Sequence, residues 1–293
     1  MGRARMYRPL DAEATAQHLP WAALLAEIAA VCREHRAGLI ACPPRLVLPL
    51  PAGGTLLVMP AISPVYSITK LVTVHPANRA RPELGLATIQ GEVVVMDSAT
   101  GERLMLLDGP TLTARRTAAV SMLAVQLLAT RPLRKILIVG AGAQALAHGE
   151  ALQALHPQAL QFVQSRRAPL ADLAAHDWDL VIAATSSMTP VLPPGVGEGA
   201  LVIGVGAFRH DMVELPPALV AAAQVFVDDP AGAQAEAGDL LAAGLAAPQT
   251  SLEDLVMGFT PADDGRTRVF KSVGCARWDL AAARVAVLTM GCA

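Results

Sequence analysis

Residues 134–155, with the sequence RKILIVGAGAQALAHGEALQAL, constrain the fold of this chain more than any other stretch. An apolar run at 136–139 leads into a glycine-rich turn, and residues with helical spacing follow the turn. The turn matches the pattern G-x-G-x-x-G/A, with Ala145 in the third position. This order of buried strand, glycine turn and helix predicts an α/β domain of the Rossmann type.

The glycine turn also predicts a ligand. Glycine lets the backbone approach phosphate groups closely, and the amino end of the following helix supplies free N–H donors. We therefore expect Gly140, Gly142, Ala143 and Gln144 to bind the pyrophosphate of a dinucleotide. The alternative is an ordinary strand, turn and helix with no ligand.

Short apolar runs after this motif are typical of a parallel sheet that is buried on both faces. The expected strands are 160–165, 180–185, 201–205 and 225–228. Only 14 residues, 166–179, separate the first two of these runs, which leaves room for one helix and no further strand. Farther on, the patterns predict helices at 233–245, 251–258 and 279–290, and a short strand and turn at 269–274.

The part of the chain before the motif has a different pattern. Residues 11–32 have helical spacing, with Pro20 as a possible break, and β-type runs follow at hairpin spacing. We expect a mainly antiparallel sheet from the runs 55–59, 66–74, 92–97 and 103–107. A long helix is expected at 111–130, with Thr111 or Thr113 as its N-cap.

Composition narrows the class of protein. The chain has 293 residues, a length that predicts two domains of ordinary size. Its residues are 53% hydrophobic and 16% charged, which is typical of a globular protein, and its net charge is −2. Neither a nucleic-acid partner nor a membrane is expected, and the location expected is the cytoplasm. Met6 is an alternative start. The cysteines, which predict neither a metal site nor a disulfide framework, are Cys32, Cys42, Cys275 and Cys292.

The end of the strand at 160–165 bears on the choice of cofactor. An acidic residue there binds the ribose of NAD, whereas arginine accommodates the 2′-phosphate of NADP. This chain has Ser165, Arg166 and Arg167 and no carboxylate, which favours NADPH and leaves NADH possible. A solvated surface pair of arginines is the alternative. Thr185 and Gly206 follow the next two strands, at the sheet edge where the cofactor is expected, and a purely structural part in a turn is the alternative for each.

These motifs and others, in this order and spacing, resemble the ornithine cyclodeaminase/mu-crystallin family over nearly the whole chain. The segments that carry the resemblance are Pro44-Arg45, Met59-Pro60-Ala61, Lys70-Leu71-Val72, Pro76-Ala77-Asn78, Asp97, Thr100-Gly101, Leu107-Asp108-Gly109, Leu112-Thr113, Arg116-Thr117-Ala118-Ala119, Gly140-Ala141-Gly142-Ala143-Gln144, Val227-Asp228-Asp229 and Phe270-Lys271-Ser272-Val273-Gly274.

The resemblance implies a homodimer with a Rossmann nucleotide-binding domain and a discontinuous α+β domain for dimerisation and substrate. We expect the substrate domain at 1–115, completed by 275–293, and the Rossmann domain at 116–274. The short segment 166–179, the short chain and the apolar Leu56 all depart from the cyclodeaminases. The chain is therefore more similar to reductases of small cyclic imino acids.

The resemblance also implies roles for four charged residues. Arg45 and Arg116 are expected to bind the substrate carboxylate, because guanidinium groups bind carboxylates with two hydrogen bonds. Lys70 is the expected proton donor, and Asp228 is expected to pair with the iminium nitrogen or to orient Lys70. Without the resemblance, Lys70 and Arg116 read as surface charges and Asp228 as part of a turn.

The leading hypothesis is therefore an enzyme that reduces Δ1-pyrroline-2-carboxylate or Δ1-piperideine-2-carboxylate to proline or pipecolate with NADPH. The alternatives are an ornithine cyclodeaminase that recycles NAD, an oxidoreductase of the alanine dehydrogenase kind, and a non-catalytic protein that binds NADPH and a small ligand. The content of aromatic residues, 3%, makes a stacking pocket for such a ligand less favoured.

Overall fold

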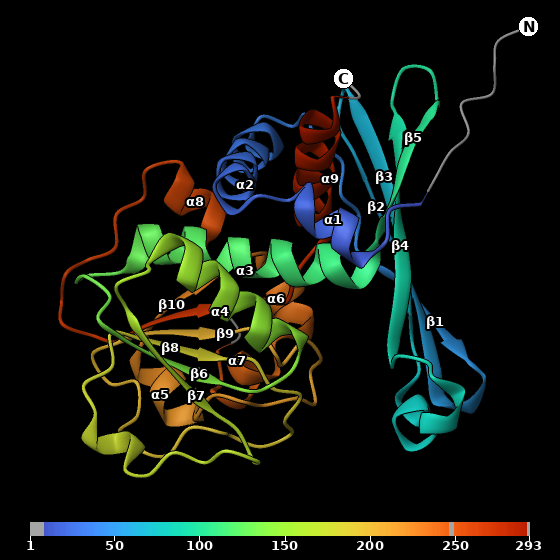
Figure 1. The fold of residues 1–293 in the computed structure, drawn as a ribbon. Helices are drawn as coiled ribbons and strands as arrows, with labels where there is room; N and C mark the ends of the chain where they lie inside the picture. The colour runs from blue at the N-terminus through green and yellow to red at the C-terminus, as the bar shows by residue number, and fades with distance from the viewer. Residues whose placement is uncertain (1–8, 246–248, 292–293) are drawn as a thin grey trace, which may run out of the picture. The chain divides into compact units, whose positions relative to one another are not determined.

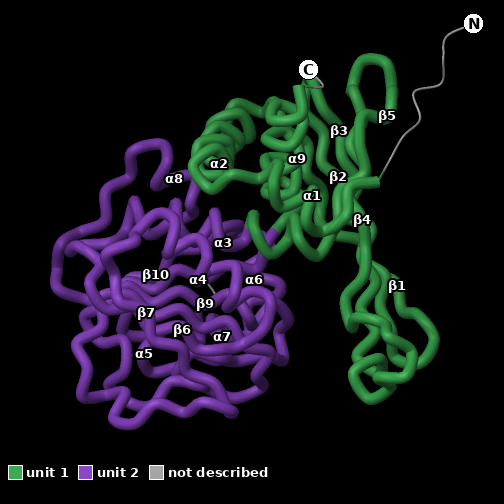
Figure 2. The backbone as a smooth tube through the Cα atoms, viewed as in Figure 1, with its two compact units in different colours: residues 1–116, 275–293 green, residues 117–274 purple. Residues whose placement is uncertain are grey.

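The structure is a computed structural model that describes residues 9–245 and 249–291, so Met6 and Cys292 lie outside the described residues. The chain divides into two compact units (Figure 2). Unit 1 comprises residues 1–116 and 275–293, and unit 2 comprises residues 117–274. The division falls one residue after the expected boundary, within helix α3 (Gly109–Leu128).

Unit 2 is built on a parallel sheet. Its seven described strands have the order β11-β10-β12-β9-β8-β6-β7, and every neighbouring pair is parallel. The strands are β6 (Lys135–Val139), β7 (Leu160–Gln164), β8 (Leu180–Ala183), β9 (Leu201–Gly204), β10 (Gln224–Val227), β11 (Thr250–Ser251) and β12 (Arg268–Lys271). The expected strands are present, each with slightly shorter bounds at its carboxyl end, and the Rossmann-like α/β class is confirmed.

The helices of unit 2 differ from expectation at two places. They are α4 (Ala143–Leu155), α5 (Pro217–Ala222), α6 (Pro230–Glu236), α7 (Gly238–Ala242), α8 (Leu252–Val256) and the 3-10 helix η4 (Leu173–Ala175). The helix expected at 233–245 is broken into α6 and α7 at Ala237, whose ψ of 87° is not helical. The next residue, Gly238, lies so close to another segment that a Cβ there would sit 2.1 Å from the carbonyl oxygen of Met212. The segment 166–179 holds only η4 instead of the expected helix, and β7 is the edge strand beside it.

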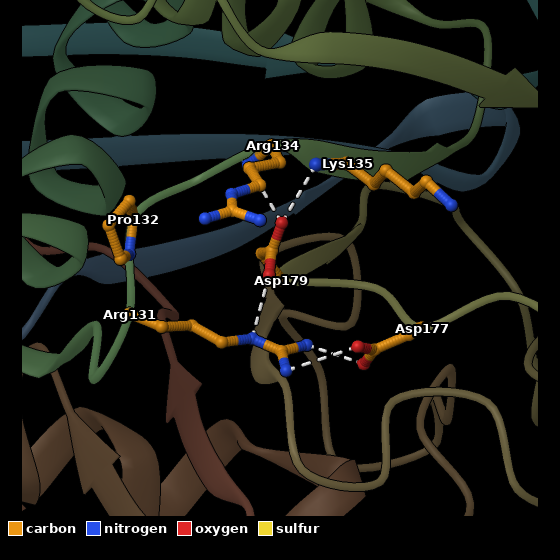
Figure 3. Close-up of a pocket in the computed structure, with 6 residues that line it drawn as sticks. All are labelled: Arg131, Pro132, Arg134, Lys135, Asp177 and Asp179. Atoms are coloured by element: carbon orange, nitrogen blue, oxygen red, sulfur yellow. Dashed lines mark hydrogen bonds and ion pairs between the residues drawn. The ribbon is translucent and has the colours of Figure 1, made fainter.

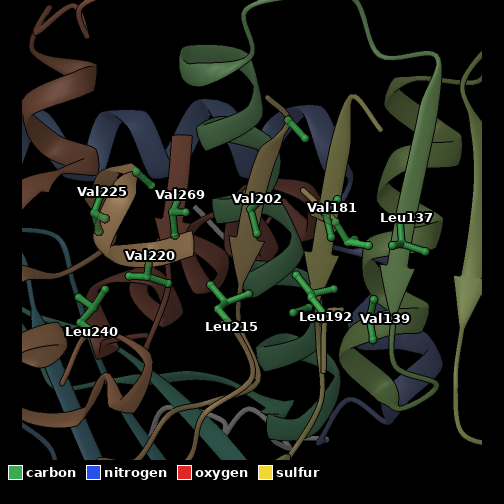
Figure 4. Packing of buried hydrophobic residues seen from close by; sticks show 14 of the residues in the cluster. Leu137, Val139, Val181, Leu192, Val202, Leu215, Val220, Val225, Leu240 and Val269 are labelled. Atoms are coloured by element: carbon green, nitrogen blue, oxygen red, sulfur yellow. The ribbon is translucent and has the colours of Figure 1, made fainter. Parts of the chain in front are cut away.

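The core of unit 2 runs through the centre of the sheet (Figure 4). Leu137, Val181, Val202, Val225 and Val269 come from five strands and are at most 8% exposed. Strands covered on both faces need apolar residues at nearly every position, which explains the continuous apolar runs of the sequence. The short run at 269–274, expected as a strand and turn, supplies β12 in the interior of this sheet.

Unit 1 contains an antiparallel sheet of five described strands that pair in sequence order (Figure 1). They are β1 (Leu46–Leu50), β2 (Gly54–Ile62), β3 (Tyr66–Val74), β4 (Ile89–Asp97) and β5 (Arg103–Asp108). Three 3-10 helices lie in its connections, η1 (Pro51–Gly53), η2 (Pro76–Ala80) and η3 (Pro82–Leu84). The antiparallel pattern predicted from the β-type runs is therefore confirmed.

The helices of unit 1 complete its core. They are α1 (Ala12–Gln17), α2 (Trp21–Arg36) and α9 (Ala276–Met290), with the first two turns of α3. Pro20 does break the first helical segment and stands at the N-cap of α2. α9 packs against α2 and β3, and its residues 276–287 are all buried.

The start of α3 corrects one expectation. The N–H group of Thr111 donates to Asp108 Oδ1 at 2.8 Å, so Asp108 caps the first turn rather than Thr111 or Thr113. Within the described ranges, no helix is both long and apolar enough to cross a membrane.

We predict that Leu137→Ala lowers the free energy of unfolding by about 2–5 kcal/mol, because it leaves a cavity in the centre of unit 2. The matched control is Leu146→Ala, since Leu146 lies on α4 with 65% of its surface exposed, and a change within about 0.5 kcal/mol is expected there. Urea unfolding followed by circular dichroism measures both. Equal losses in the two variants would contradict this account of the core.

Candidate active site

Lys70 lies in the middle of β3, where it pairs in register with Met59 of β2 and Val93 of β4. Its side chain is 3% exposed, so the sequence-based alternative of a surface lysine is wrong. The Nζ atom lies 2.7 Å from Oδ2 of Asp279 and 3.4 Å from the hydroxyl of Thr113. Lys70 is therefore a buried ammonium group paired with a carboxylate, and such surroundings shift the pKa of a lysine.

Asp279 is the residue of this site that sequence reasoning missed. It is fully buried in the first turn of α9, and its Oδ1 accepts a hydrogen bond from Nε of Arg116 at 2.9 Å. One carboxylate therefore joins Lys70 to Arg116. The signal was an acidic residue in an alanine-rich apolar helix, together with the need of two buried cations for a negative partner.

The ionisation of Lys70 is set by opposing effects. Burial is the largest, and it lowers the pKa of Lys70 to about 8. The positive charges of Arg116 and Arg45 act in the same direction, whereas Asp279 raises the pKa. Lys70 thus carries a proton at neutral pH that it can release more readily than an exposed lysine.

The charges of this site leave a positive surplus. Lys70 and Arg116 carry two positive charges and share the single carboxylate of Asp279, and the positive charge of Arg45 also acts on Lys70. Arg116 uses its Nε atom on Asp279, and no described residue accepts a hydrogen bond from its two terminal nitrogens. Lys70 and Arg116 thus meet at one carboxylate, with the charge of Arg45 acting on Lys70, and the binding of a small carboxylate by Arg45 and Arg116 stays a prediction.

The glycine turn of unit 2 has the form of a phosphate cradle. Gly140 has a φ of +134°, and a Cβ there would lie 2.5 Å from the carbonyl oxygen of Ala184, so glycine is required. At Gly142, the N-cap of α4, a Cβ would meet nothing within 4 Å, and no described side chain caps the helix. Its first N–H groups therefore have no side-chain acceptor among the described residues, as dinucleotide binding needs.

The residues around this cradle also fit a dinucleotide. The Oε1 atom of Gln144 is buried and has no hydrogen-bond partner among the described residues. Beyond the end of β7, Arg166 and Arg167 are exposed, and the Ser165 hydroxyl accepts a hydrogen bond from the N–H of Ala168 at 3.1 Å. Free cations at this position suit a phosphate on the ribose.

Thr185 and Gly206 each lie two residues beyond the end of a strand, β8 and β9 respectively. Their N–H groups, however, donate to the carboxylate of Glu214, at 3.0 Å and 2.6 Å. Burial raises the pKa of Glu214, while Lys271 and these N–H groups oppose the rise. The two backbone donors are therefore already used within unit 2.

Asp228 follows β10 and is fully buried in unit 2. Its carboxylate accepts hydrogen bonds from the Ser272 hydroxyl at 2.8 Å and from the N–H groups of Val273 at 3.0 Å and Gly274 at 2.8 Å. It thus anchors the loop after β12. The carboxylate that orients Lys70 is Asp279, and a direct part for Asp228 in catalysis stays a prediction.

Comparison with known proteins agrees with this geometry. The profile of the ornithine cyclodeaminase/mu-crystallin family matches residues 10–165 and 168–287. The chain belongs to this family. Δ1-Pyrroline-2-carboxylate reductase 1 of Burkholderia multivorans is 45% identical, over 94% of both chains. A Δ1-pyrroline-2-carboxylate/Δ1-piperideine-2-carboxylate reductase of Azospirillum brasilense is 43% identical over the same shares.

Solved structures share the family fold. The Δ1-pyrroline-2-carboxylate reductase of Thermococcus litoralis, in complex with NADH and L-proline, has a TM-score of 0.83 at 24% identity and covers 95% of this chain and 97% of its own. An archaeal alanine dehydrogenase dimer with bound NAD has a TM-score of 0.84 at 22% identity, covering 96% of this chain and 94% of its own.

One pocket of this family member is lined by Arg131, Pro132, Arg134, Lys135, Asp177 and Asp179 (Figure 3). It has a volume of about 340 Å³ and lies beside Lys135, the first residue of β6. Arg131 is paired there with Asp177 at 2.6 Å and Asp179 at 2.7 Å. Ligands of open α/β sheets bind at the carboxyl ends of strands, so this pocket at their amino ends is not the cofactor site.

We predict that Asp279→Asn lowers the pKa of Lys70 below its value of about 8, because the variant removes the negative charge that raises it. The chain has only three lysines, Lys70, Lys135 and Lys271, so isotope-labelled lysine gives three side-chain signals whose pH titration is measured by NMR. Each signal is assigned by a lysine-to-arginine variant. The exposed Lys135 is the internal control. An unchanged or higher pKa of Lys70 would rule out the ion pair as the stabilising contact.

Proposed function

We propose that this protein reduces a cyclic imino acid with NAD(P)H, converting Δ1-pyrroline-2-carboxylate to proline or Δ1-piperideine-2-carboxylate to pipecolate. The observation that carries the proposal is the buried Lys70–Asp279 pair beside Arg116, in a chain 45% identical to a reductase of this kind. An α-imino acid presents an anion next to a basic nitrogen. A site with surplus positive charge and a releasable proton matches both groups.

The residues of unit 1 divide the work in this proposal. Arg116 and Arg45 bind the substrate carboxylate, Arg116 through the terminal nitrogens that Asp279 leaves unused. Lys70 gives its proton to the imine nitrogen, which makes the adjacent carbon a better hydride acceptor. The cofactor, when bound, supplies the hydride. Asp279 keeps Lys70 charged and oriented before the transfer.

Asp228 is proposed as a second polar group for the reacting nitrogen. Its carboxylate has a fixed orientation, because Ser272 and the backbone of Val273 and Gly274 hold it. Gly140, Gly142, Ala143 and Gln144 are proposed to bind the pyrophosphate, and their open cradle supports this.

We propose NADPH as the preferred cofactor. The support is the end of β7, where Arg166 and Arg167 are exposed beside Ser165 and the described residues 164–168 include no carboxylate to bind a ribose hydroxyl. A 2′-phosphate dianion gains charge-assisted hydrogen bonds there.

A homodimer is also proposed, with unit 1 supplying both the substrate site and the dimer contact. β1 supports this, since it is an edge strand in which Leu46, Val47 and Leu48 are 41–54% exposed. Exposed apolar edge strands are typical of surfaces that pair with another chain. A related alanine dehydrogenase is described as a dimer.

The proposal predicts NADPH oxidation with both imines, followed by absorbance, and a loss of about 10²–10⁴ in kcat/KM for Lys70→Met. Lys70→Arg is expected to lose nearly as much, because guanidinium keeps the charge but does not release a proton. Lys135→Met, at an exposed lysine, is the matched control and should retain activity. In the unmodified protein, kcat/KM should fall as pH rises through about 8, where Lys70 loses its proton.

No oxidation of NADPH or NADH with either imine would reject the proposal. Ammonia release from ornithine with tightly held NAD would show a cyclodeaminase instead, and NAD reduction with L-alanine would show an alanine dehydrogenase. Binding of NADPH without turnover of any of these substrates would show a non-catalytic binder. Full activity of Lys70→Arg would remove the proton transfer and leave Lys70 a purely electrostatic role.

For the cofactor, we predict that replacing both Arg166 and Arg167 by alanine raises the KM for NADPH by about 10–100-fold, the effect of losing charged hydrogen bonds. The KM for NADH should change little, since NADH has no 2′-phosphate. Arg134→Ala, an exposed arginine at the amino end of β6, is the matched control. An equal rise in the KM for NADPH and for NADH would show that Arg166 and Arg167 do not bind the 2′-phosphate.

A further inference from the structure

Glu214 joins the carboxyl ends of two neighbouring strands of unit 2. Its Oε2 accepts hydrogen bonds from the N–H and hydroxyl groups of Thr185, after β8, at 3.0 Å and 3.2 Å. Its Oε1 accepts from the N–H groups of Gly206 at 2.6 Å and Ala207 at 3.1 Å, after β9. The carboxylate is fully buried. A side chain from a later loop therefore occupies the N–H donors at these two strand ends.

The backbone segments around Glu214 are closely packed at Gly206. A Cβ on Gly206 would lie 1.8 Å from the carbonyl oxygen of Thr185 and 2.7 Å from Oε2 of Glu214. Such distances exclude any side chain at position 206 without movement of the backbone. Glycine is therefore required at position 206, where the segments that follow β8 and β9 come into close contact.

Two further charges hold Glu214 in place. Lys271, the last residue of β12, lies 2.9 Å from Oδ2 of Asp239 and 3.6 Å from Oε1 of Glu214. Asp239, in α7, accepts hydrogen bonds from the N–H groups of Glu214 at 2.7 Å and Leu215 at 2.9 Å. All three charged side chains are fully buried. We name Glu214, Asp239 and Lys271 the buried triad.

A buried triad of this kind is not explained by stability alone. Apolar residues of similar volume often stabilise a core as well as a buried ion pair does, whereas directed hydrogen bonds can specify one geometry. The geometry specified here is that of the carboxyl ends of β8 and β9. In open α/β sheets this edge receives the ligand.

We propose that the buried triad positions the segments after β8 and β9 for the nicotinamide half of the cofactor. The proposal rests on the proposed function, because it assumes a dinucleotide at this edge. The glycine turn and the end of β7 bind the adenosine half, and the triad shapes the remaining part of the site. Glu214, Asp239 and Lys271 are positioning residues in this account, and Thr185 and Gly206 contribute shape rather than N–H donors to the cofactor.

The test is Glu214→Gln, which keeps the size of the side chain but turns an NH₂ group toward backbone N–H donors. Isothermal titration calorimetry measures the Kd of NADPH and of 2′,5′-ADP, which carries only the adenosine half. We expect the Kd of NADPH to rise at least about tenfold, as for lost hydrogen bonds to a charged group, with the Kd of 2′,5′-ADP unchanged. If the unmodified protein prefers NADH, then NADH and ADP replace these two ligands.

Asp177→Asn is the matched control, because Asp177 is an exposed carboxylate paired with Arg131 near the amino ends of the strands. It should change neither Kd. Asp239→Asn is the second variant, judged by the same criterion if Glu214→Gln does not fold. Unchanged affinity for NADPH, or an equal loss for both ligands, would overturn the proposal. Failure of the unmodified protein to bind either dinucleotide would instead reject the proposed function.

Discussion

The buried carboxylate of Asp279 is the contact on which the charged centre of unit 1 depends. Lys70 and Arg116 are both nearly inaccessible to water, and two like charges in a desolvated place repel each other and lose hydration. Asp279 offsets both costs, because each of its oxygens faces one cation. It also explains the discontinuous unit, since the carboxylate of this site is on the last helix, 163 residues after Arg116.

Each of the two units contains a buried cluster of charged residues. The clusters differ in the sign of their excess charge and in whether hydrogen-bond donors remain unused. In unit 1, cations outnumber the carboxylate, and Arg116 keeps hydrogen-bond donors that no described residue uses. In unit 2, the two carboxylates of the buried triad outnumber Lys271 and take up backbone N–H groups instead. Surplus positive charge and open donors attract an anion, whereas a closed cluster fixes the backbone around it. The same kinds of residue thus serve binding in one unit and shape in the other.

Much of this fold follows from local patterns. The run 136–139, the glycine turn and the helical spacing after it give β6 and α4, because each element is specified by neighbouring residues. The single helix expected at 233–245 is instead interrupted at Ala237, beside the close approach of Gly238 to the carbonyl oxygen of Met212. That contact between distant segments is not visible in the local sequence. The segment 166–179 also differs from expectation, because it contains only the three-residue 3-10 helix η4 instead of an α-helix.

The candidate site shows the same division. Arg45, Lys70 and Arg116 could be chosen because the resemblance fixes their register, and the structure brings them together. Asp279 and Glu214 could not be chosen, because each acts through contacts with residues far away in the sequence. Once the fold is known, their partners show that such carboxylates are needed. Buried cations require a negative partner, and converging buried N–H groups require an acceptor.

The chemistry proposed for Lys70 depends on a balance between burial and Asp279. Burial lowers the pKa toward that of a lysine that has lost its proton, and Asp279 raises it toward that of a lysine that holds its proton tightly. A pKa of about 8 lies between these limits, near the pH at which proton transfer is needed. The last helix of the chain therefore does more than complete a core: through one side chain it sets how readily a strand residue in the first third of the sequence can act as an acid.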